Sequence, residues 1–461
     1  MMQKKIWIVI VLIFIGISGY PLKTISLEPS KSVVISLAGD VMMDRSVGRL
    51  IEQRGIDYPW EKVTPILKKS DLVLVNLETS IGTKGTASPD KSYTFQSKPQ
   101  TLDGLVNAGV HGVSIANNHI LDFGQEGFIE TLENLEQRDI KYAGGGRNLE
   151  RALEPAIWNI NGQRIGFLAF SRVIYDMSWY ATSNRPGIVS AYDNYVEQIE
   201  KTIAESKKNI DFLIVSVHWG KEREQYPQDY QRRVGKIMID AGADVVMGHH
   251  PHVLQGIEFY KEKPIIYSLG NFVFNSIGQL SNQTMIFNIE VGEGRIMNCY
   301  VTPITIVNGQ PNVAEEKVKM EIIDNLNLIS REWRTEVLSD GQVVGNVTYF
   351  IPADTNKEND ELKNGPIDED RTGDKGEKRS IESSKKMRNL SYMLGFKMDF
   401  QEEHRATMTK GKRIFHLDFS NTILTTNKRK DGVAGFFESV FVHFPARLMC
   451  QMFQWEFQLN S

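Results

Sequence analysis

The stretch ADVVMGHHPH, residues 243–252, joins an apolar run to three of the nine histidines of the chain. Its apolar part predicts a strand buried on both faces, because short continuous apolar runs suit such strands. Open α/β sheets bind ligands just beyond the carboxyl ends of their strands. The stretch therefore indicates an α/β fold with a candidate metal site where this strand ends.

The same pattern recurs through residues 31–309. The runs ISLAGD, LVLVNLE, VSIANNH and LIVSVH predict four more buried strands. Residues 124–139, 195–208 and 230–242 have helical periodicity between the runs. This order predicts an α/β fold with a mainly parallel central sheet. Residues 284–307 are typical of a hairpin, which favours a second sheet layer.

Each of these five strands ends in a side chain that can bind a metal. Parallel strands point their carboxyl ends the same way, so these side chains should converge. Carboxylate, amide and imidazole groups suit Mn²⁺, Fe or Zn²⁺ better than Ca²⁺, which prefers oxygen ligands alone. We therefore predict a site for one or two divalent metal ions. The predicted ligands are Asp40, Glu78, Asn118, His218, His250 and His252.

Each residue taken alone also has a plainer interpretation. Asp40 could cap a following helix, Asn118 could form a turn, and His218 could simply be hydrogen-bonded. The coincidence of five such strand ends favours the metal site. His249 is expected to face away, because adjacent residues of an extended segment point to opposite sides.

Three further acidic residues have two open interpretations. Asp122 follows His119 by three residues, so it either orients that imidazole or caps the helix that begins near Gly124. Asp44 either supplies an oxygen to the metal or is exposed on the next helix. Glu222 is either near the site or in a solvated loop.

Composition excludes several classes of protein. The net charge of −4 over 461 residues gives no indication that nucleic acid is a partner. The two cysteines, Cys299 and Cys450, cannot form a disulfide framework or a thiolate metal cluster. Any metal must therefore be held by oxygen and nitrogen ligands.

The N-terminus has the pattern of an export signal. Lys4 and Lys5 precede an apolar run at residues 6–17. The pattern predicts a signal-anchor or a cleaved signal within residues 1–30. It also predicts a single-pass location in the cell membrane, with most of the chain outside the cytoplasm.

The remaining divisions follow composition. Residues 31–325 are predicted to form the α/β domain, and residues 326–389 a linker that is charged and disordered from residue 354. Residues 390–461 are a C-terminal tail without a clear period or motif, so their structure and role stay open.

The motifs SLAGDVMMDR, VNLETSIG, IANNHILDFG, VSVHWGKE, GADVVMGHHPHVLQG and YSLGNFVFN occur in this order between residues 32 and 305. As a set they resemble the poly-gamma-glutamate capsule biosynthesis protein family (CapA), within the calcineurin-like metallophosphoesterase superfamily. The resemblance implies a four-layer αββα sandwich with a two-metal site. It does not extend beyond about residue 325.

The resemblance also implies roles for individual residues. Glu78 corresponds to the bridging carboxylate, and His119 to the general acid or polarising group. Asp122 then joins His119 in the catalytic set as its orienting partner. Met42 stands where the superfamily has a histidine, and a thioether is a poor ligand for hard divalent metals. The site therefore departs from a full two-metal pattern.

Two functions follow from these expectations. One is a metal-dependent hydrolase or transferase that acts on a phosphoester, an amide or a polymer linkage. The other is a non-catalytic component of capsule assembly whose metal site is structural. The resemblance implies capsule polymer (poly-gamma-glutamate), a membrane ligase complex and the membrane itself as partners.

Overall fold

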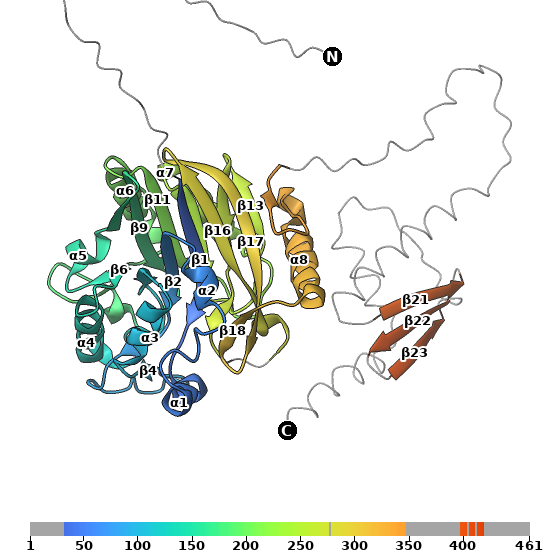
Figure 1. Ribbon diagram of the computed structural model, residues 1–461, viewed down its shortest axis with the longest axis horizontal. Coiled ribbons are helices and arrows are strands. Elements are labelled where there is room, and N and C mark those ends of the chain that lie inside the picture. Colours follow the sequence, from blue (N-terminus) through green and yellow to red (C-terminus); the bar gives the residue numbers. More distant parts are fainter. Residues whose placement is uncertain (1–31, 276–277, 347–396, 403–404, 411–412, 419–461) are drawn as a thin grey trace, which may run out of the picture. The chain divides into compact units, whose positions relative to one another are not determined.

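The computed structural model describes residues 32–275 and 278–346, together with three strands at 397–402, 405–410 and 413–418. The chain divides into two compact units, Met1–Ile351 and Pro352–Ser461. The candidate site lies in the first unit, which contains two large sheets (Figure 1).

The first sheet has eight strands, in the order β18-β17-β16-β1-β2-β5-β6, with β15 paired to β1. They are β1 (Val33–Val41), β2 (Leu72–Leu77), β5 (Gly112–Ser114), β6 (Lys141–Ala143), β15 (Asn271–Val273), β16 (Gln283–Gly292), β17 (Arg295–Val307) and β18 (Gln310–Val313). Strands β1, β2, β5 and β6 are parallel, and β16 joins β1 in antiparallel register. The predicted hairpin is confirmed as β16 and β17, and it extends this sheet.

The second sheet has six strands, in the order β13-β14-β12-β11-β9-β8. They are β8 (Ala156–Ile160), β9 (Gln163–Ser171), β11 (Phe212–His218), β12 (Val245–His249), β13 (Ile257–Tyr260) and β14 (Lys263–Ile266). Strands β9, β11, β12 and β14 are parallel, and the edge strands β8 and β13 are antiparallel. The mainly parallel sheet and the second sheet layer expected from the sequence are therefore two sheets, each with a parallel centre.

Eight α-helices lie in the described residues, and all but the last of them cover the outer faces of the two sheets. They are α1 (Arg45–Arg54), α2 (Thr64–Leu67), α3 (Thr101–Asn107), α4 (Gly124–Glu136), α5 (Leu149–Leu153), α6 (Val196–Lys207), α7 (Asp229–Ala241) and α8 (Glu316–Ser330). The first four pack on the first sheet and the next three on the second. Figure 1 shows α8 beside β13 and β17, with which it is in contact.

Adjacent residues of one strand pack on opposite faces of its sheet, one between the two sheets and the other against the helices. This alternation separates the layers of helices from the layers of strands. On β2, Leu74 packs between the sheets and Val75 packs against the helices. On β11, Ile214 packs between the sheets and Val215 packs against α6 and α7. Both faces are apolar because side chains alternate along a strand and each face is covered. The four-layer αββα sandwich is thus confirmed.

Short elements complete the described residues. The two-residue strands are β3 (Ser80–Ile81), β4 (Gln96–Ser97), β7 (Gly145–Gly146), β10 (Gly187–Ile188), β19 (Glu336–Val337) and β20 (Val343–Val344). The 3-10 helices are η1 (Met177–Trp179), η2 (Asp193–Tyr195), η3 (Leu280–Asn282) and η4 (Arg331–Trp333).

The predicted domain boundary after residue 325 falls inside α8. Residues Leu326 and Ile329 of this helix are buried, and so are Trp333, Val337 and Val343 beyond it. The folded unit therefore extends past the boundary, because an amphipathic helix closes the end of the core between the sheets. In the tail, β21 (Lys397–Glu402), β22 (Arg405–Lys410) and β23 (Arg413–Asp418) form an antiparallel sheet.

The predicted single-pass location in the cell membrane is contradicted by the helices of the described residues. None of the helices in the described ranges is long and apolar enough to cross a bilayer. Their apolar residues form one face, which the sheets bury, as Phe128, Leu132 and Leu135 do in α4. The N-terminal run that led to the prediction lies outside the described residues.

Candidate metal centre

The candidate ligands come from both sheets. Asp40 lies at the end of β1, and Glu78 directly follows β2. Asn118 lies in the turn after β5. From the second sheet, His218 is the last residue of β11, and His250 follows β12. The carboxyl ends of the two sheets therefore face each other at one site, as the strand-end argument requires of parallel strands.

Because Gly39 and Gly248 have no side chains, residues 267–271 can pack directly against the ends of β1 and β12. A Cβ added to Gly39 would lie 2.0 Å from the carbonyl oxygen of Gly270, and one added to Gly248 would lie 2.0 Å from that of Tyr267. The N–H of Asp40 donates to the Gly270 oxygen at 3.0 Å. Residues 267–271 thus tie β1 to β12 immediately beside the ligands.

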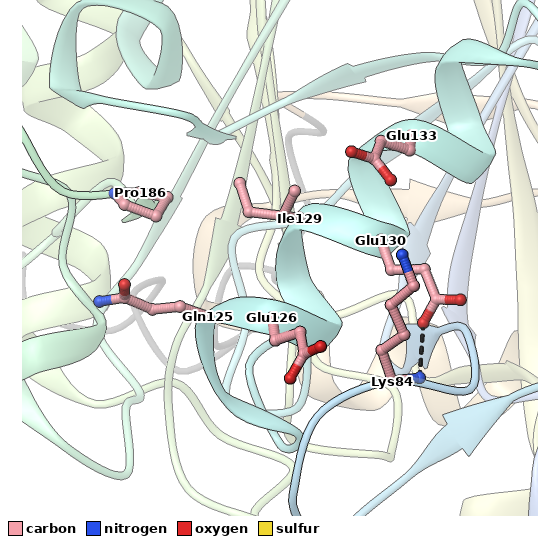
Figure 2. A pocket seen from close by; sticks show the side chains of 7 residues that line it. All are labelled: Lys84, Gln125, Glu126, Ile129, Glu130, Glu133 and Pro186. Carbon is pink, nitrogen blue, oxygen red and sulfur yellow. Dashed lines mark hydrogen bonds between the residues drawn. The ribbon is translucent and has the colours of Figure 1, made fainter.

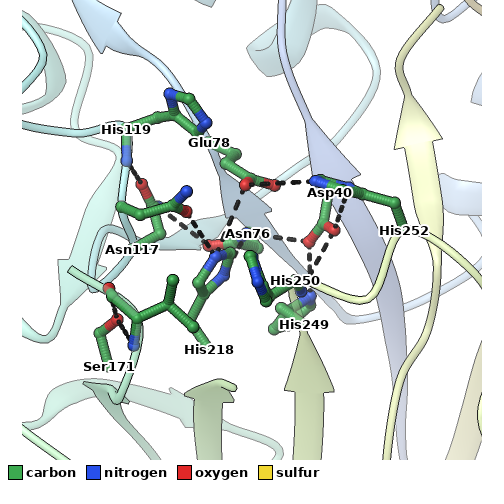
Figure 3. A network of polar contacts seen from close by, with 12 residues as sticks. Asp40, Asn76, Glu78, Asn117, His119, Ser171, His218, His249, His250 and His252 are labelled. Carbon is green, nitrogen blue, oxygen red and sulfur yellow. Dashed lines mark hydrogen bonds and ion pairs between the residues drawn. The ribbon is translucent and has the colours of Figure 1, made fainter. Parts of the chain in front are cut away.

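The carboxylate of Glu78 lies at the centre of the site (Figure 3). The side chain is fully buried, and neither oxygen has a hydrogen-bond partner among the described residues. Oε1 lies 3.5 Å from His218 Nε2 and 3.8 Å from His252 Nε2. Burying a carboxylate without hydrogen bonds is costly, which makes Glu78 a candidate metal ligand.

Two sets of ligand atoms converge on Glu78. Each set lies within 4.8 Å, one formed by Glu78, His250 and His252 and the other by Asp40, Glu78 and His218. The amide oxygen of Asn118 lies 2.7 Å from His218 Nε2, which places it beside the second set. The structure therefore brings all six predicted ligands together, and metal binding by them stays a prediction.

Asp40 is held by donors from three directions. His249 Nδ1 donates to Oδ1 at 3.0 Å, and Asn76 Nδ2 donates to the same oxygen at 2.9 Å. His252 Nδ1 lies 3.2 Å from Oδ2. These contacts fix the carboxylate and leave the Nε2 of His252 directed toward Glu78.

The expectation that His249 faces away from the site is wrong. Its side chain is fully buried against Asp40. The alternation rule fails here because the chain turns sharply after β12, with φ of 93° at His250 and 57° at His252. Non-glycine residues with positive φ carry backbone strain, which is frequent at functional sites. His249 is thus a positioning residue for Asp40.

Burial and neighbouring charges perturb the titration of the site. Burial raises the pKa of Glu78 well above its usual value, and the charge of Asp40 raises it further. Burial lowers the pKa of His250 to about 3. Burial also opposes protonation of His252, but Glu78 and Asp40 outweigh it and raise the pKa of His252 to about 9. Perturbed groups clustered in this way mark functional sites.

His119 lies beside the predicted ligands and is oriented by Asp122. The His119 Nδ1–H donates to Asp122 Oδ2 at 2.7 Å, and the backbone N–H of Phe95 donates to the same oxygen at 2.7 Å. The Phe95 ring packs against the imidazole at a tilt of 34°, with centroids 4.3 Å apart. Of the two interpretations of Asp122, the geometry agrees with the orienting one, and α4 has no side-chain cap.

Lys91 joins this group, and sequence reasoning missed it. Its ammonium pairs with Asp122, donates to the carbonyl oxygen of Asn118 and lies 3.2 Å from His119 Nδ1. The side chain is 10 % exposed and lies over the Trp179 ring. Lys91 comes from a polar loop without periodicity, so no local pattern indicated it.

The remaining sequence candidates lie off the ligand set. The sulfur of Met42 accepts the N–H of Asp44 at 3.3 Å. Asp44 Oδ2 accepts the N–H of Gln96 at 2.9 Å, so this carboxylate already has a partner. Glu222 is exposed in the loop after β11. Neither acid replaces the histidine that Met42 displaces.

A shallow hollow of about 300 Å³ lies over α4 (Figure 2). Glu126, Glu130 and Glu133 line it, and no predicted ligand does. Glu130 Oε2 accepts the backbone N–H of Lys84 at 2.7 Å, so it holds the preceding loop. The hollow is therefore separate from the metal centre.

The chain is thus an αββα sandwich whose facing strand ends bring together carboxylate and imidazole side chains that could hold a metal. The chain belongs to the bacterial capsule synthesis protein PGA_cap family, whose model matches residues 34–276.

Similar proteins agree with this assignment. The chain is 33% identical over 286 residues to the capsule biosynthesis protein CapA of Bacillus anthracis, covering 61% of this chain and 69% of that protein. It is 33% identical over 291 residues to the PGA biosynthesis protein CapA of Bacillus subtilis, covering 62% and 76%. A probable polyglutamine synthesis accessory protein of Mycobacterium tuberculosis is 28% identical over 281 residues, covering 52% and 74%.

Solved structures with partial similarity include two proteins. One is the NAD nucleotidase of Haemophilus influenzae, with a TM-score of 0.35 and 12% identity over 65% of this chain and 63% of that one. The other is the TT1561 protein of Thermus thermophilus, with a TM-score of 0.33 and 12% identity over 57% and 99%.

Proposed function

We propose that this chain acts in capsule biosynthesis as a metal-dependent hydrolase or transferase. Its substrate is a phosphoester or a linkage of the poly-gamma-glutamate polymer. The observation that carries the proposal is Glu78, a buried carboxylate without hydrogen-bond partners among the described residues, facing two imidazoles. A centre of this kind is suited to chemistry at an oxygen or carbonyl group.

The residues present fit one or two divalent metal ions. Unpartnered buried atoms include both oxygens of Glu78 and the Nδ1 of His250. Asp40, Glu78 and His218 would hold one ion with Asn118 beside them, and Glu78, His250 and His252 would hold a second. The mixed oxygen and nitrogen shell favours Mn²⁺, Fe or Zn²⁺. The chemistry that such an ion supplies is Lewis-acid polarisation of a substrate oxygen and acidification of water.

His119 is the proton donor in this proposal. Asp122 accepts the Nδ1–H at 2.7 Å, so the imidazolium form of His119 would carry a second proton on Nε2, give it to the leaving group and become neutral. Lys91 neutralises Asp122 and fixes the carbonyl of Asn118. The Phe95 ring, packed against the imidazole, limits its rotation.

A second function has one observation in its favour. Met42 stands where the superfamily has a histidine ligand, so the second ion has few ligands. The centre would then be structural, and the chain would bind capsule polymer or a partner ligase without catalysis. An intact His119 is not required in that case.

Metal analysis of the purified full chain tests the centre. Wild type should bind Mn²⁺ or Zn²⁺ near stoichiometrically, and the double variant His250→Ala/His252→Ala should lose it. His111→Ala removes a half-buried histidine outside the centre and should keep the metal. Metal retained by the double variant contradicts the ligand set.

The variant His119→Ala separates the two functions. We expect it to keep the metal and lose about 10²–10⁴-fold in Mn²⁺-dependent hydrolysis of an alkyl phosphodiester, whose alkoxide leaving group needs a proton, as removal of a general acid does. Capsule output in a strain that depends on this chain should fall with it. Full output from a metal-loaded His119→Ala chain would support the structural function instead.

A further inference from the structure

Two buried asparagines, Asn76 and Asn117, lie among the candidate ligands without belonging to them (Figure 3). Asn76 lies in β2, and Asn117 lies in the segment after β5. Both side chains are fully buried, and a buried amide is expected to have partners for its two N–H donors and its oxygen. The roles assigned above to the ligands and to His119 leave Asn117 unused, so its partners indicate what it does.

The side chain of Asn117 joins two segments that carry residues of the site. Its Nδ2 donates to the carbonyl oxygen of Leu77 at 2.8 Å, and its Oδ1 accepts the backbone N–H of His119 at 3.0 Å. The first contact holds the peptide that leads into Glu78, and the second holds the peptide between Asn118 and His119. The backbone pairing of β2 with β5 has already ended there, so this amide continues the connection between the two segments.

Asn117 also fixes which way the amide of Asn76 points. Asn117 Nδ2 donates to Asn76 Oδ1 at 3.1 Å. Because that oxygen already has a donor, Asn76 presents its nitrogen to Asp40 and donates to Asp40 Oδ1 at 2.9 Å. The same nitrogen lies 3.4 Å from His218 Nδ1, at the limit of a hydrogen bond. An amide of reversed orientation would place its oxygen against the carboxylate of Asp40, and the two would repel each other.

The two amides therefore connect three segments that follow different strands. These segments carry Asp40 after β1, Glu78 after β2, and His119 after β5. Groups that orient metal ligands typically change metal affinity or activity about 10–100-fold when they are removed. A plainer role, satisfying buried backbone groups, would affect the fold but would not couple one amide to the other.

We propose that Asn76 and Asn117 form one positioning unit, which holds Asp40 and Glu78 in fixed relation to the proton donor His119. This inference rests on the proposed function, because it assigns a role to further residues of the same site. Neither asparagine touches the substrate, and both act through the groups that they hold. Loss of either one should therefore loosen the same set of ligands.

Calorimetric titration of Mn²⁺ into the full chain tests the unit with Asn76→Ala, Asn117→Ala and the double variant. We expect each single variant to lower Mn²⁺ affinity about tenfold. Because one unit can be broken only once, the double variant should lose about as much as a single one, and not the product of about a hundredfold. Asn134→Ala is the matched control: Asn134 is also buried, donates to the carbonyl oxygen of Glu130 at 2.9 Å on α4, and should change affinity less than about twofold.

Hydrolysis of the alkyl phosphodiester at saturating Mn²⁺ gives a second measurement. Both single variants should lower kcat about tenfold and change KM less than about twofold, because neither asparagine touches the substrate. Melts in EDTA report the fold separately, and a purely structural role would lower the melting temperature without this kinetic pattern. If Asn117→Ala does not fold, Asn117→Ser replaces it, since its hydroxyl can serve a nearby backbone group but is too short to reach Asn76.

The outcomes separate this inference from the proposed function. Losses of affinity that multiply in the double variant, or a folded Asn117 variant that binds Mn²⁺ as wild type does, overturn the inference and leave the proposed function standing. An equal loss in Asn134→Ala also overturns it. Coupled losses of Mn²⁺ affinity in a chain that hydrolyses no phosphodiester support the positioning unit and contradict the hydrolase. Wild type that binds no Mn²⁺ overturns both.

Discussion

The change Glu78→Gln should have opposite effects on stability with and without metal. In the metal-free chain, Glu78 is a buried carboxylate without hydrogen bonds, and its burial raises its pKa. A buried carboxylate whose charge is offset only by the contacts at 3.5 Å and 3.8 Å with His218 and His252 costs more than an unpartnered amide, which costs about 1–3 kcal/mol. We therefore expect the variant to be more stable than wild type by about 1–2 kcal/mol in EDTA.

With metal bound, we expect wild type to be more stable than Glu78→Gln. A metal at one hundred times its dissociation constant stabilises the native state by about 2.7 kcal/mol. Glu78 belongs to both ligand sets, so the variant should gain less than about 1 kcal/mol. Each kcal/mol corresponds to about 2–4 °C in the melting temperature of a chain of this size. The melting temperature of wild type should then rise by about 5–10 °C with Mn²⁺, while that of the variant should change little.

Thermal melts in EDTA and in MnCl₂ measure both effects, with Glu258→Gln as the matched control. Glu258 is also buried, but it has partners, Tyr267 at 2.6 Å and Lys236 at 2.9 Å. Its replacement should lower the melting temperature in both buffers and leave the metal increment intact. An Mn²⁺ increment in Glu78→Gln as large as that of wild type would refute the reasoning.

Three further predictions follow from the geometry around the centre. Gly39→Ala should destabilise the chain by about 2–3 kcal/mol in urea unfolding, because its Cβ would lie 2.0 Å from a backbone oxygen; Gly292→Ala, whose Cβ meets only a flexible side chain, should change stability by less than about 0.5 kcal/mol. Lys91→Met should lower metal affinity or hydrolysis about 10–100-fold, with partial recovery in Lys91→Arg, because Lys91 holds both Asp122 and the carbonyl before His119. In EDTA, the stability of wild type relative to His252→Asn should fall by about 3 kcal/mol between pH 6.5 and 9. The pKa of His252 is raised to about 9 in the folded chain, so its contribution is complete below the unfolded value of 6.5 and is lost as pH rises through 9. A flat pH difference would contradict this last expectation.

Much of the fold could be predicted from local patterns. The runs that end in Asp40, Glu78 and His218 are strands of the structure, since continuous apolar runs report burial on both faces. Helix α4, with Phe128 on its buried face, could also be predicted from the spacing of its apolar residues. The end of the domain was not, because α8 is stabilised by packing between sheets that are remote in sequence.

The residues of the candidate site also divide into those that a local sequence pattern indicates and those that it does not. Asn76 interrupts an apolar strand, which is a local signal, and it donates to Asp40. Lys91 and His249 carry no such signal. Lys91 lies in a polar loop. For His249, the alternation of side chains along a strand predicted an orientation away from the site, and the turn at His250 breaks that alternation.

The sequence by itself determined the strand ends, the kinds of ligand at them and the family to which the chain belongs, because these depend on residues close together or on motifs in order. Only the tertiary structure decided that the ligands come from two facing sheets, joined where Gly39 and Gly248 admit residues 267–271. It also decided that Lys91 and His249 enter the site. Such contacts depend on how the two layers stack, and no local period encodes the relative position of segments 30 to 200 residues apart.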